Sequence, residues 1–264
     1  MELDLKNEML SSGISFWEMI RPPEDISTNG HLIENVFNYT TALNIFYFIL
    51  VCAGLFGFSY FYHHRRHPRP YYTYGNKKIH LMVTAGIGLA VFFTIDLNIT
   101  RMSNNDMVNT FWKWPDETKE EVLKVEVLAQ QWMWHFRQAG VDGEFNSQDD
   151  IVTAHELVVP VDTKLMFQIV SKDVIHSFYV PNARIKVDAM PGRVSRIWME
   201  LTKEGTYDIA CAEMCGTHHY LMQAKLIVKS KEDYESWKKE AHKLAMQTND
   251  ESYPESLWGW KWEN

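Results

Sequence analysis

The stretch Cys211-Ala-Glu-Met-Cys215-Gly-Thr-His-His219-Tyr-Leu-Met222 places two thiols, two imidazoles and a thioether close together in the chain. Thiolates are soft, strong metal ligands, imidazoles suit copper and zinc, and thioethers bind weakly with a leaning to copper. The packing of a protein core does not explain why these three kinds of side chain occur together in one loop. The stretch therefore predicts a metal site, and the segments around it indicate the fold that carries this site.

The metal-binding stretch lies between two runs that have the pattern of β-strands, residues 206–210 and 223–228. Further strand candidates precede them: residues 122–127, 132–136, 156–159, 164–171 and 196–201. Turn signals separate these candidates: Asp142-Gly143, Pro160, Pro181-Asn182, Pro191-Gly192 and Glu204-Gly205. Short strands divided by turns at this spacing are typical of an antiparallel sandwich or barrel. Residues 121–228 are thus predicted to form an all-β domain.

A further histidine, His176, lies upstream in a segment predicted to be a loop. Copper sites that transfer electrons use two histidines, one cysteine and a weak axial methionine. The present set offers one thiol more than that, and two thiolates can bridge a pair of copper ions. The candidate copper ligands are His176, Cys211, Cys215, His219 and Met222.

Two other metal centres remain open on spacing alone. His176, Cys211, Cys215 and His219 would make a Cys2His2 zinc set, although zinc has no need of Met222. The Cys215-Gly-Thr-His218 segment has the spacing of one half of a Rieske cluster, but a second Cys/His box is absent from the sequence. His218 could also replace His219 as a ligand.

Two apolar runs, about residues 41–62 and 79–99, stand out in the first hundred residues. Each has about the length of roughly 20 residues that a bilayer-spanning helix needs. The loop between them, residues 63–78, carries five basic and no acidic residues. The positive-inside rule places such a loop in the cytoplasm, so both termini are expected on the outer side.

The remaining segments differ in composition from the membrane spans and the β domain. Residues 1–39 form a polar, acidic segment outside the membrane, and residues 100–120 are predicted to be a linker. Residues 229–264 begin as a charged helix, which we expect to lie on its own domain, and end with Trp258, Trp260 and Trp262. Residues 102–264 carry 26 acidic and 18 basic residues, which disfavours a nucleic-acid partner and favours a basic protein partner.

The motif Cys-x-Glu-x-Cys-Gly-x-x-His-x-x-Met at residues 211–222 resembles the CuA loop of subunit II of the haem–copper cytochrome c oxidases. The segments Asp173–Ser177, Val187–Arg193 and Gln131–Trp134 are similar to three further signatures of that family. The resemblance covers about residues 30–228. It implies an N-terminal two-helix transmembrane hairpin, residues 40–99, followed by a C-terminal all-β cupredoxin-like Greek-key sandwich or barrel.

The resemblance also implies a role for each residue of the loop. Cys211 and Cys215 would bridge two copper ions, and His176 and His219 would each bind one of them. Met222 would be a weak ligand to one copper, and the backbone carbonyl of Glu213 a ligand to the other. The Glu213 side chain would reach a magnesium or manganese ion shared with subunit I.

Trp132 would be the residue through which electrons enter from cytochrome c. Without the resemblance, an aromatic side chain in the core or at the membrane face is the simpler interpretation of Trp132. His80 stands where the family usually has a glutamate at the mouth of a proton channel. Histidine titrates near neutral pH, so His80 could be the entry to a proton path, and it could equally lie in the membrane interface without such a role.

The expected function is that of an electron-transfer subunit of a terminal oxidase in a bacterial inner membrane, with the copper domain on the periplasmic side. The subunit would accept electrons from cytochrome c, or from a cytochrome c domain of a supercomplex, and pass them to haem in subunit I, where oxygen is reduced to water. Its partners would be subunit I, other oxidase subunits and membrane lipid. A CuA subunit of a nitric-oxide reductase and a membrane-anchored copper-binding or assembly protein are the alternatives.

Overall fold

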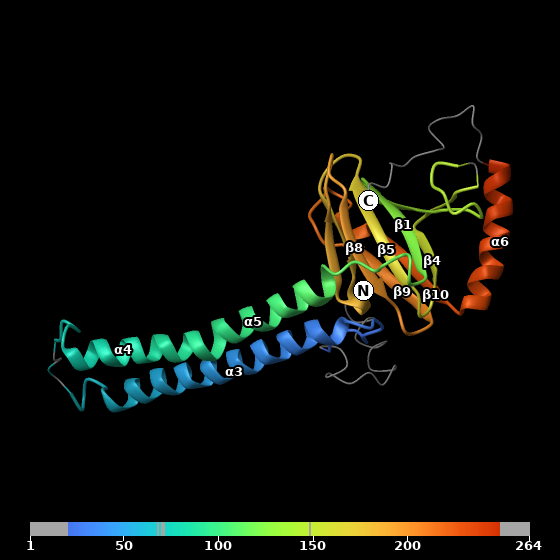
Figure 1. Cartoon of the computed structure of the whole chain (residues 1–264). Helices are drawn as coiled ribbons and strands as arrows, with labels where there is room; N and C mark the ends of the chain where they lie inside the picture. Colours follow the sequence, from blue (N-terminus) through green and yellow to red (C-terminus); the bar gives the residue numbers. More distant parts are fainter. Residues whose placement is uncertain (1–20, 68, 70–71, 148, 249–264) are drawn as a thin grey trace, which may run out of the picture. The chain divides into compact units, whose positions relative to one another are not determined.

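The computed structural model describes residues 21–67, 69, 72–147 and 149–248 (Figure 1). The chain divides into two compact units: a helical unit of residues 29–122, and a β unit that combines the residues up to Thr28 with those from Leu123 onward. The predicted tryptophan cluster, Trp258, Trp260 and Trp262, and residues 1–20 of the predicted N-terminal segment lie outside the described residues.

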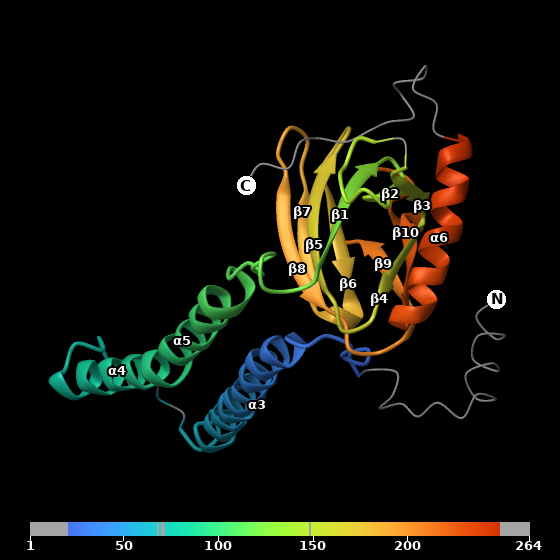
Figure 2. The same cartoon turned by 45° about the vertical axis from the view of Figure 1, so that its right-hand side comes forward.

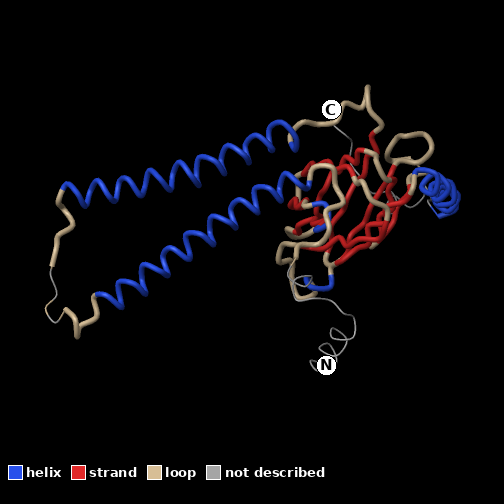
Figure 3. Tube along the Cα trace, turned by 90° about the horizontal axis from the view of Figure 1, so that it is seen from below, coloured by secondary structure: helices blue, strands red, loops and turns tan. Residues whose placement is uncertain are grey.

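The helical unit consists of two long apolar helices that run side by side and are joined by a loop (Figure 3). The first is α3 (Gly30–Phe61). The second is continuous from Lys78 to Phe111 and contains α4 (Lys78–Val91), α5 (Leu97–Asp106) and two π-helical turns, η1 (Phe92–Asp96) and η2 (Met107–Phe111). Both are long and apolar enough to cross a membrane. The second extends through the first half of the predicted linker, where the polar composition had favoured a loop.

The two helices are joined by hydrogen bonds at the first π-helical turn. The Tyr39 hydroxyl donates to the backbone carbonyl of Thr94, and the Tyr47 hydroxyl lies 3.2 Å from Thr94 Oγ1. Asn98 Nδ2 donates to the Phe93 carbonyl at 2.7 Å. A π turn breaks the regular i→i−4 ladder, and these side chains satisfy the carbonyls that it leaves available.

The β unit is a sandwich of two five-stranded sheets, in the orders β3-β2-β1-β5-β8 and β4-β10-β9-β6-β7 (Figure 2). The strands of the first sheet are β1 (Val122–Gln130), β2 (Met133–Gln138), β3 (Ile151–Ala154), β5 (Lys164–Ser171) and β8 (Ser195–Glu200). Those of the second are β4 (Glu156–Pro160), β6 (His176–Val180), β7 (Ile185–Ala189), β9 (Gly205–Cys211) and β10 (Gln223–Lys229). The predicted fold class, a helical hairpin followed by an all-β cupredoxin-like domain, is confirmed. The pair β4–β10 is parallel, whereas the other strand pairs are antiparallel.

The core of the sandwich follows from the alternation of side chains along the strands. On β1, Val125, Val127 and Ala129 are fully buried, as expected for residues that point to one face of a strand. Aromatic rings fill the centre, where Trp134 and Phe178 pack edge to face with centroids 5.7 Å apart. This packing brings strands of both sheets together beneath the loop that follows β9.

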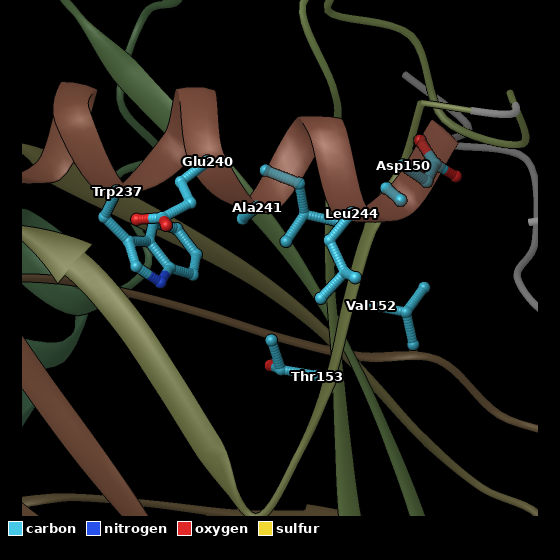
Figure 4. A pocket seen from close by; sticks show the side chains of 9 residues that line it. Asp150, Val152, Thr153, Trp237, Glu240, Ala241 and Leu244 are labelled. Atoms are coloured by element: carbon cyan, nitrogen blue, oxygen red, sulfur yellow. The ribbon is translucent and has the colours of Figure 1, made fainter. Parts of the chain in front are cut away.

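Helix α6 (Lys231–Thr248) packs on β3, β4 and β10, in agreement with the expectation that the charged tail helix lies on its own domain. Its buried Tyr234 donates a hydrogen bond of 2.7 Å to Gln138 Oε1. Burial raises the pKa of the Tyr234 hydroxyl, so this hydroxyl remains a donor. A groove of about 500 Å³ remains between α6 and β3, with Trp237 and Leu244 on one wall and Val152 on the other (Figure 4).

A cluster of buried charges lies between β1, β2 and the loop before β3. Arg137 is paired with Glu126, its cross-strand neighbour, and its Nη1 lies 3.3 Å from Asp150 Oδ2. None of these three side chains is more than 1% exposed. Burial raises the pKa of Asp150, while the positive charge of Arg137 acts in the opposite direction. The guanidinium therefore supplies the positive charge that offsets the cost of burying the two carboxylates in the core.

A short segment before the helical hairpin belongs to the β unit. Ile26 is fully buried, and its backbone N–H donates to the Asn182 carbonyl at 3.0 Å. The Thr28 N–H donates to the Glu200 carbonyl at 3.0 Å, and Thr202 N–H donates to the Ile26 carbonyl at 2.7 Å. The chain thus contributes to the β unit both before and after the hairpin.

Candidate metal centre

The predicted metal ligands come from one end of the second sheet. His176 is the first residue of β6 rather than part of a loop, and Cys211 is the last residue of β9. These strands are neighbours, with Phe178 opposite Cys211, so the pairing brings the imidazole beside the thiol. Cys215, His219 and Met222 lie on the loop that leads from β9 to β10.

Donor atoms of all five predicted ligands lie close together. The two Sγ atoms of Cys211 and Cys215 are 3.8 Å apart. Cys211 Sγ lies 3.9 Å from His176 Nδ1, and Cys215 Sγ lies 3.5 Å from His219 Nδ1. The Met222 Sδ atom is 3.9 Å from Cys215 Sγ, and its side chain is only 1% exposed. Two thiols, two imidazole Nδ1 atoms and a buried thioether are a donor set that fits copper.

Glu213 faces the cluster with its backbone and solvent with its side chain. Its carbonyl oxygen lies 3.3 Å from Cys211 Sγ, while the residue as a whole is exposed. His218 does not join the donor set, because its ring packs on Trp132 instead. The structure therefore brings together the ligand set with His219 and leaves His218 beside it.

Asp173 and Gln131 form an outer layer that orients the cluster. Asp173 Oδ1 lies 2.8 Å from His176 Nε2, so that the imidazole can present Nδ1 to a metal. Asp173 Oδ2 accepts a 2.7 Å hydrogen bond from the Gln131 backbone N–H, and Gln131 Nε2 donates to the Cys215 carbonyl at 2.8 Å. The sequence predicts no role for Gln131 itself, and the local signal for it is its position directly before Trp132 in the aromatic segment.

The two thiols differ in acidity. Burial opposes ionisation of Cys211, but hydrogen bonds with His176 and with the backbone of Ser177 and Glu213 lower its pKa to about 6. Burial, followed by the charge on Cys211, raises the pKa of Cys215 to about 12. Cys211 is therefore the more acidic thiol of the pair, and both thiols must lose their protons to bind a metal, because metal-bound cysteine is a thiolate.

Trp132 lies against the ligand loop, whereas Trp134 is fully buried in the core. The indole N–H of Trp132 donates to the Cys215 carbonyl at 3.2 Å, and its ring is half-buried. A Cβ atom on Gly216 would lie 3.0 Å from Cζ2 of this indole, and Gly216 has a φ of +121°. The loop thus needs a glycine at this position both for its backbone conformation and for the close approach of Trp132.

His80, the predicted proton-path residue, lies on α4 in the helical unit and takes no part in the metal cluster. It is half-buried, and its Nδ1 has no hydrogen-bond partner among the described residues.

Comparison with known proteins agrees with the geometry of the cluster. A family model described as the periplasmic domain of cytochrome c oxidase subunit II matches residues 123–230. The chain is 30% identical over 236 residues to the alternative cytochrome c oxidase subunit 2 of Bradyrhizobium diazoefficiens, and the match covers 80% of this chain and 81% of that protein. This chain belongs to the cytochrome c oxidase subunit II family. Its two long apolar helices fit a membrane-anchored subunit of a cytochrome c oxidase.

Other members of the subunit II family match over shorter stretches. The cytochrome c oxidase subunit 2 of Thermostichus vulcanus is 36% identical over 132 residues, which cover 50% of this chain and 37% of that protein. The probable subunit 2 of Rickettsia conorii is 36% identical over 137 residues, 47% of this chain and 44% of the other. The chain thus spans less than half the length of these two relatives.

Among solved structures, the periplasmic domain of cytochrome oxidase subunit II of Bradyrhizobium japonicum matches with a TM-score of 0.42 and 26% identity, over 46% of this chain and 94% of the other. A haem–copper terminal oxidase dimer matches with a TM-score of 0.38 and 23% identity, over 56% of this chain and 96% of the matched chain.

Proposed function

We propose that this chain is the electron-entry subunit of a terminal oxidase that holds a dinuclear copper (CuA) centre. Electrons from cytochrome c enter at this centre and pass to haem in subunit I, where oxygen is reduced to water. The copper pair, when bound, accepts and releases single electrons. The chain itself carries out no oxygen chemistry.

The observation that carries the proposal is the pairing of each thiol with its own imidazole. Cys211 lies beside His176, Cys215 lies beside His219, and the two sulfur atoms are 3.8 Å apart. A mononuclear copper site needs one thiolate with both histidines around it. Here each thiol has its own imidazole, and the two thiols are neighbours. This arrangement would suit two metal ions that share the two thiolates, with one imidazole on each ion.

The remaining residues support this centre in distinct ways. Met222 and the Glu213 carbonyl supply the weak donors, and the burial of Met222 excludes water from one side of the cluster. Asp173 fixes the imidazole of His176. Trp132 offers a half-exposed ring whose N–H contacts the backbone of a bridging cysteine, which suits a residue at which electrons enter.

The test is to load the full chain with copper in detergent and to record its metal content and paramagnetic resonance spectrum. We expect two copper ions per chain and hyperfine structure from one electron shared by two copper nuclei. Cys215→Ser should abolish this signal. Cys52→Ser is the matched control, because Cys52 lies on α3 outside the cluster and its loss should leave the signal unchanged. A single-copper or zinc-only site would refute the proposal.

We further propose that the Glu213 carboxylate binds a magnesium or manganese ion shared with subunit I. Its exposure on the loop leaves it free to face another subunit. When the oxidase complex is expressed in cells supplied with manganese, Glu213→Gln should remove the paramagnetic resonance signal of manganese and keep that of copper. Retention of the manganese signal would exclude this role.

The proposed location is a bacterial inner membrane, with the basic loop of residues 63–78 in the cytoplasm and the β unit in the periplasm. The charge asymmetry of the two sides supports this orientation. A cysteine placed at residue 76 should be inaccessible to a membrane-impermeant thiol reagent in intact cells. Labelling of Asn76→Cys beyond that of the unmodified chain, whose own Cys211 and Cys215 would lie in the periplasm, would show the opposite orientation.

His80 is proposed as an entry point for protons, on the basis of its place near the start of the second helix. If it takes part, proton pumping by a His80→Ala complex should show an altered pH dependence. An unchanged dependence would leave His80 without that role.

A further inference from the structure

His218 makes a contact that its position in the sequence does not reveal. It immediately precedes His219, is exposed, and has its ring centroid 4.5 Å from that of Trp132 at an interplanar angle of 64°. This is an edge-to-face arrangement of two aromatic rings, which is favoured over a face-to-face stack.

Among the described residues, the indole of Trp132 also contacts the backbone of the ligand loop. Its N–H reaches the Cys215 carbonyl at 3.2 Å, and its six-membered ring lies over Gly216. A donor–acceptor distance of 3.2 Å is at the long end of the range for such a bond. A small rotation of the indole away from the loop would therefore break it.

The imidazole of His218 also contacts a neighbouring hydroxyl. Thr217 Oγ1 lies 3.3 Å from His218 Nδ1, so the hydroxyl makes a weak contact with the ring that packs on the indole. Thr217, His218 and Trp132 thus form a chain of contacts on the exposed side of the ligand loop. Cys215, the residue whose carbonyl accepts the indole N–H, lies on the other side.

We propose that His218 is a positioning residue for Trp132. Its imidazole keeps the indole N–H on the Cys215 carbonyl, and so maintains a short path of bonds between a half-buried aromatic ring and a cysteine that would bridge the two copper ions. The role in electron entry rests on the proposed function, whereas the role in holding the indole does not. An aromatic contact of this kind changes the population of the held orientation by roughly two- to tenfold.

The first measurement is hydrogen exchange at the Trp132 indole N–H. It uses the full chain without copper in detergent micelles, labelled with ¹⁵N-tryptophan and assigned with Trp132→Phe. His218→Ala should accelerate this exchange by roughly two- to tenfold. His218→Phe keeps an aromatic edge and should restore protection, and Thr217→Val should give a smaller acceleration. Met214→Ala is the control, because Met214 is 74% exposed on the same loop and should have no effect.

The second measurement is the single-turnover rate of electron injection from a photoreduced cytochrome c into the assembled oxidase. His218→Ala should slow injection several-fold within the bound complex, with unchanged copper resonance and unchanged donor affinity, and His218→Phe should recover the rate. Equal indole exchange in wild type and His218→Ala overturns the proposal, as does a slower rate caused by weaker donor binding alone. Loss of the copper signal in the wild type would count against the proposed function and would leave the exchange result standing.

Discussion

Replacing Arg137 by methionine tests whether the buried charge cluster depends on its single cation. Methionine keeps most of the length of the side chain, so the change removes the positive charge and its hydrogen bonds while it limits the loss of packing. Glu126 and Asp150 are 0% and 1% exposed, and both would then be buried without the guanidinium. Breaking a buried pair in this way costs about 3–5 kcal/mol. A domain has a total stability of about 5–15 kcal/mol, so the loss would be a large fraction of it.

The loss of unfolding free energy in Arg137→Met should depend on pH, and its direction follows from the pKa of Asp150. Burial already raises the pKa of Asp150, and without Arg137 this pKa rises further. Between the pKa of an unfolded aspartate, about 3.9, and the raised folded value, the folded state binds more protons than the unfolded state. The free energy of unfolding of the variant therefore falls as pH rises through this window, and its deficit relative to the wild type is largest near neutral pH.

The assay is urea unfolding of the full chain in detergent, followed by near-ultraviolet circular dichroism at neutral and at acidic pH. Glu126→Gln added to Arg137→Met removes one of the two uncompensated charges and should recover part of the loss. Lys186→Met is the control, because this lysine is exposed on β7 and its replacement should leave the midpoint unchanged. The reasoning would be refuted if Arg137→Met lowers the free energy of unfolding by less than about 1 kcal/mol at neutral pH, or if this loss grows on acidification.

Three further predictions concern the ligand loop and helix α6. Met222→Leu conserves volume and should lower the free energy of unfolding by less than about 1.5 kcal/mol. Met222→Ala leaves a cavity and should lower it by about 2–5 kcal/mol. Equal losses for the two variants in urea unfolding would contradict this prediction. Gly216→Ala should cost about 1–3 kcal/mol and displace Trp132, seen as a changed indole resonance, because the added Cβ meets the ring at 3.0 Å on a backbone with φ of +121°. Tyr234→Phe leaves Gln138 Oε1 without its donor and should cost about 1–3 kcal/mol, with faster amide exchange in α6; unaltered exchange would show that the bond does not hold the helix.

The sequence was sufficient for the parts of the molecule that follow from local patterns. The two apolar helices depend on composition alone, and four of the five candidate metal ligands are soft donors at fixed spacing in one short loop. That they bind copper stays a prediction. Strands with clear alternation, such as β5, were found for the same reason. Strand β6, which begins at His176, lies where the sequence predicted a loop, and the sequence predicted no strand at β3 or β7.

Contacts between distant residues could not be predicted in this way. The helix continues to Phe111 through a polar segment that has no apolar pattern, and its last turn is π-helical. The hydrogen bond from Gln131 to the Cys215 carbonyl joins residues 84 positions apart. The contact of His218 with Trp132 likewise depends on the way the ligand loop lies over the start of β2. Such contacts depend on tertiary structure and leave no periodic signal in the chain.

The contribution of Ile26 and Thr28 to the β unit has a practical consequence for work with fragments. A soluble fragment cut after the hairpin, for example before Val122, omits a segment that the folded domain uses. It would expose the apolar site that Ile26 fills and leave the carbonyls of Asn182 and Glu200 to solvent. A better fragment would keep residues 21–28 and replace the membrane hairpin by a short flexible linker, so that the domain retains its own first piece of chain.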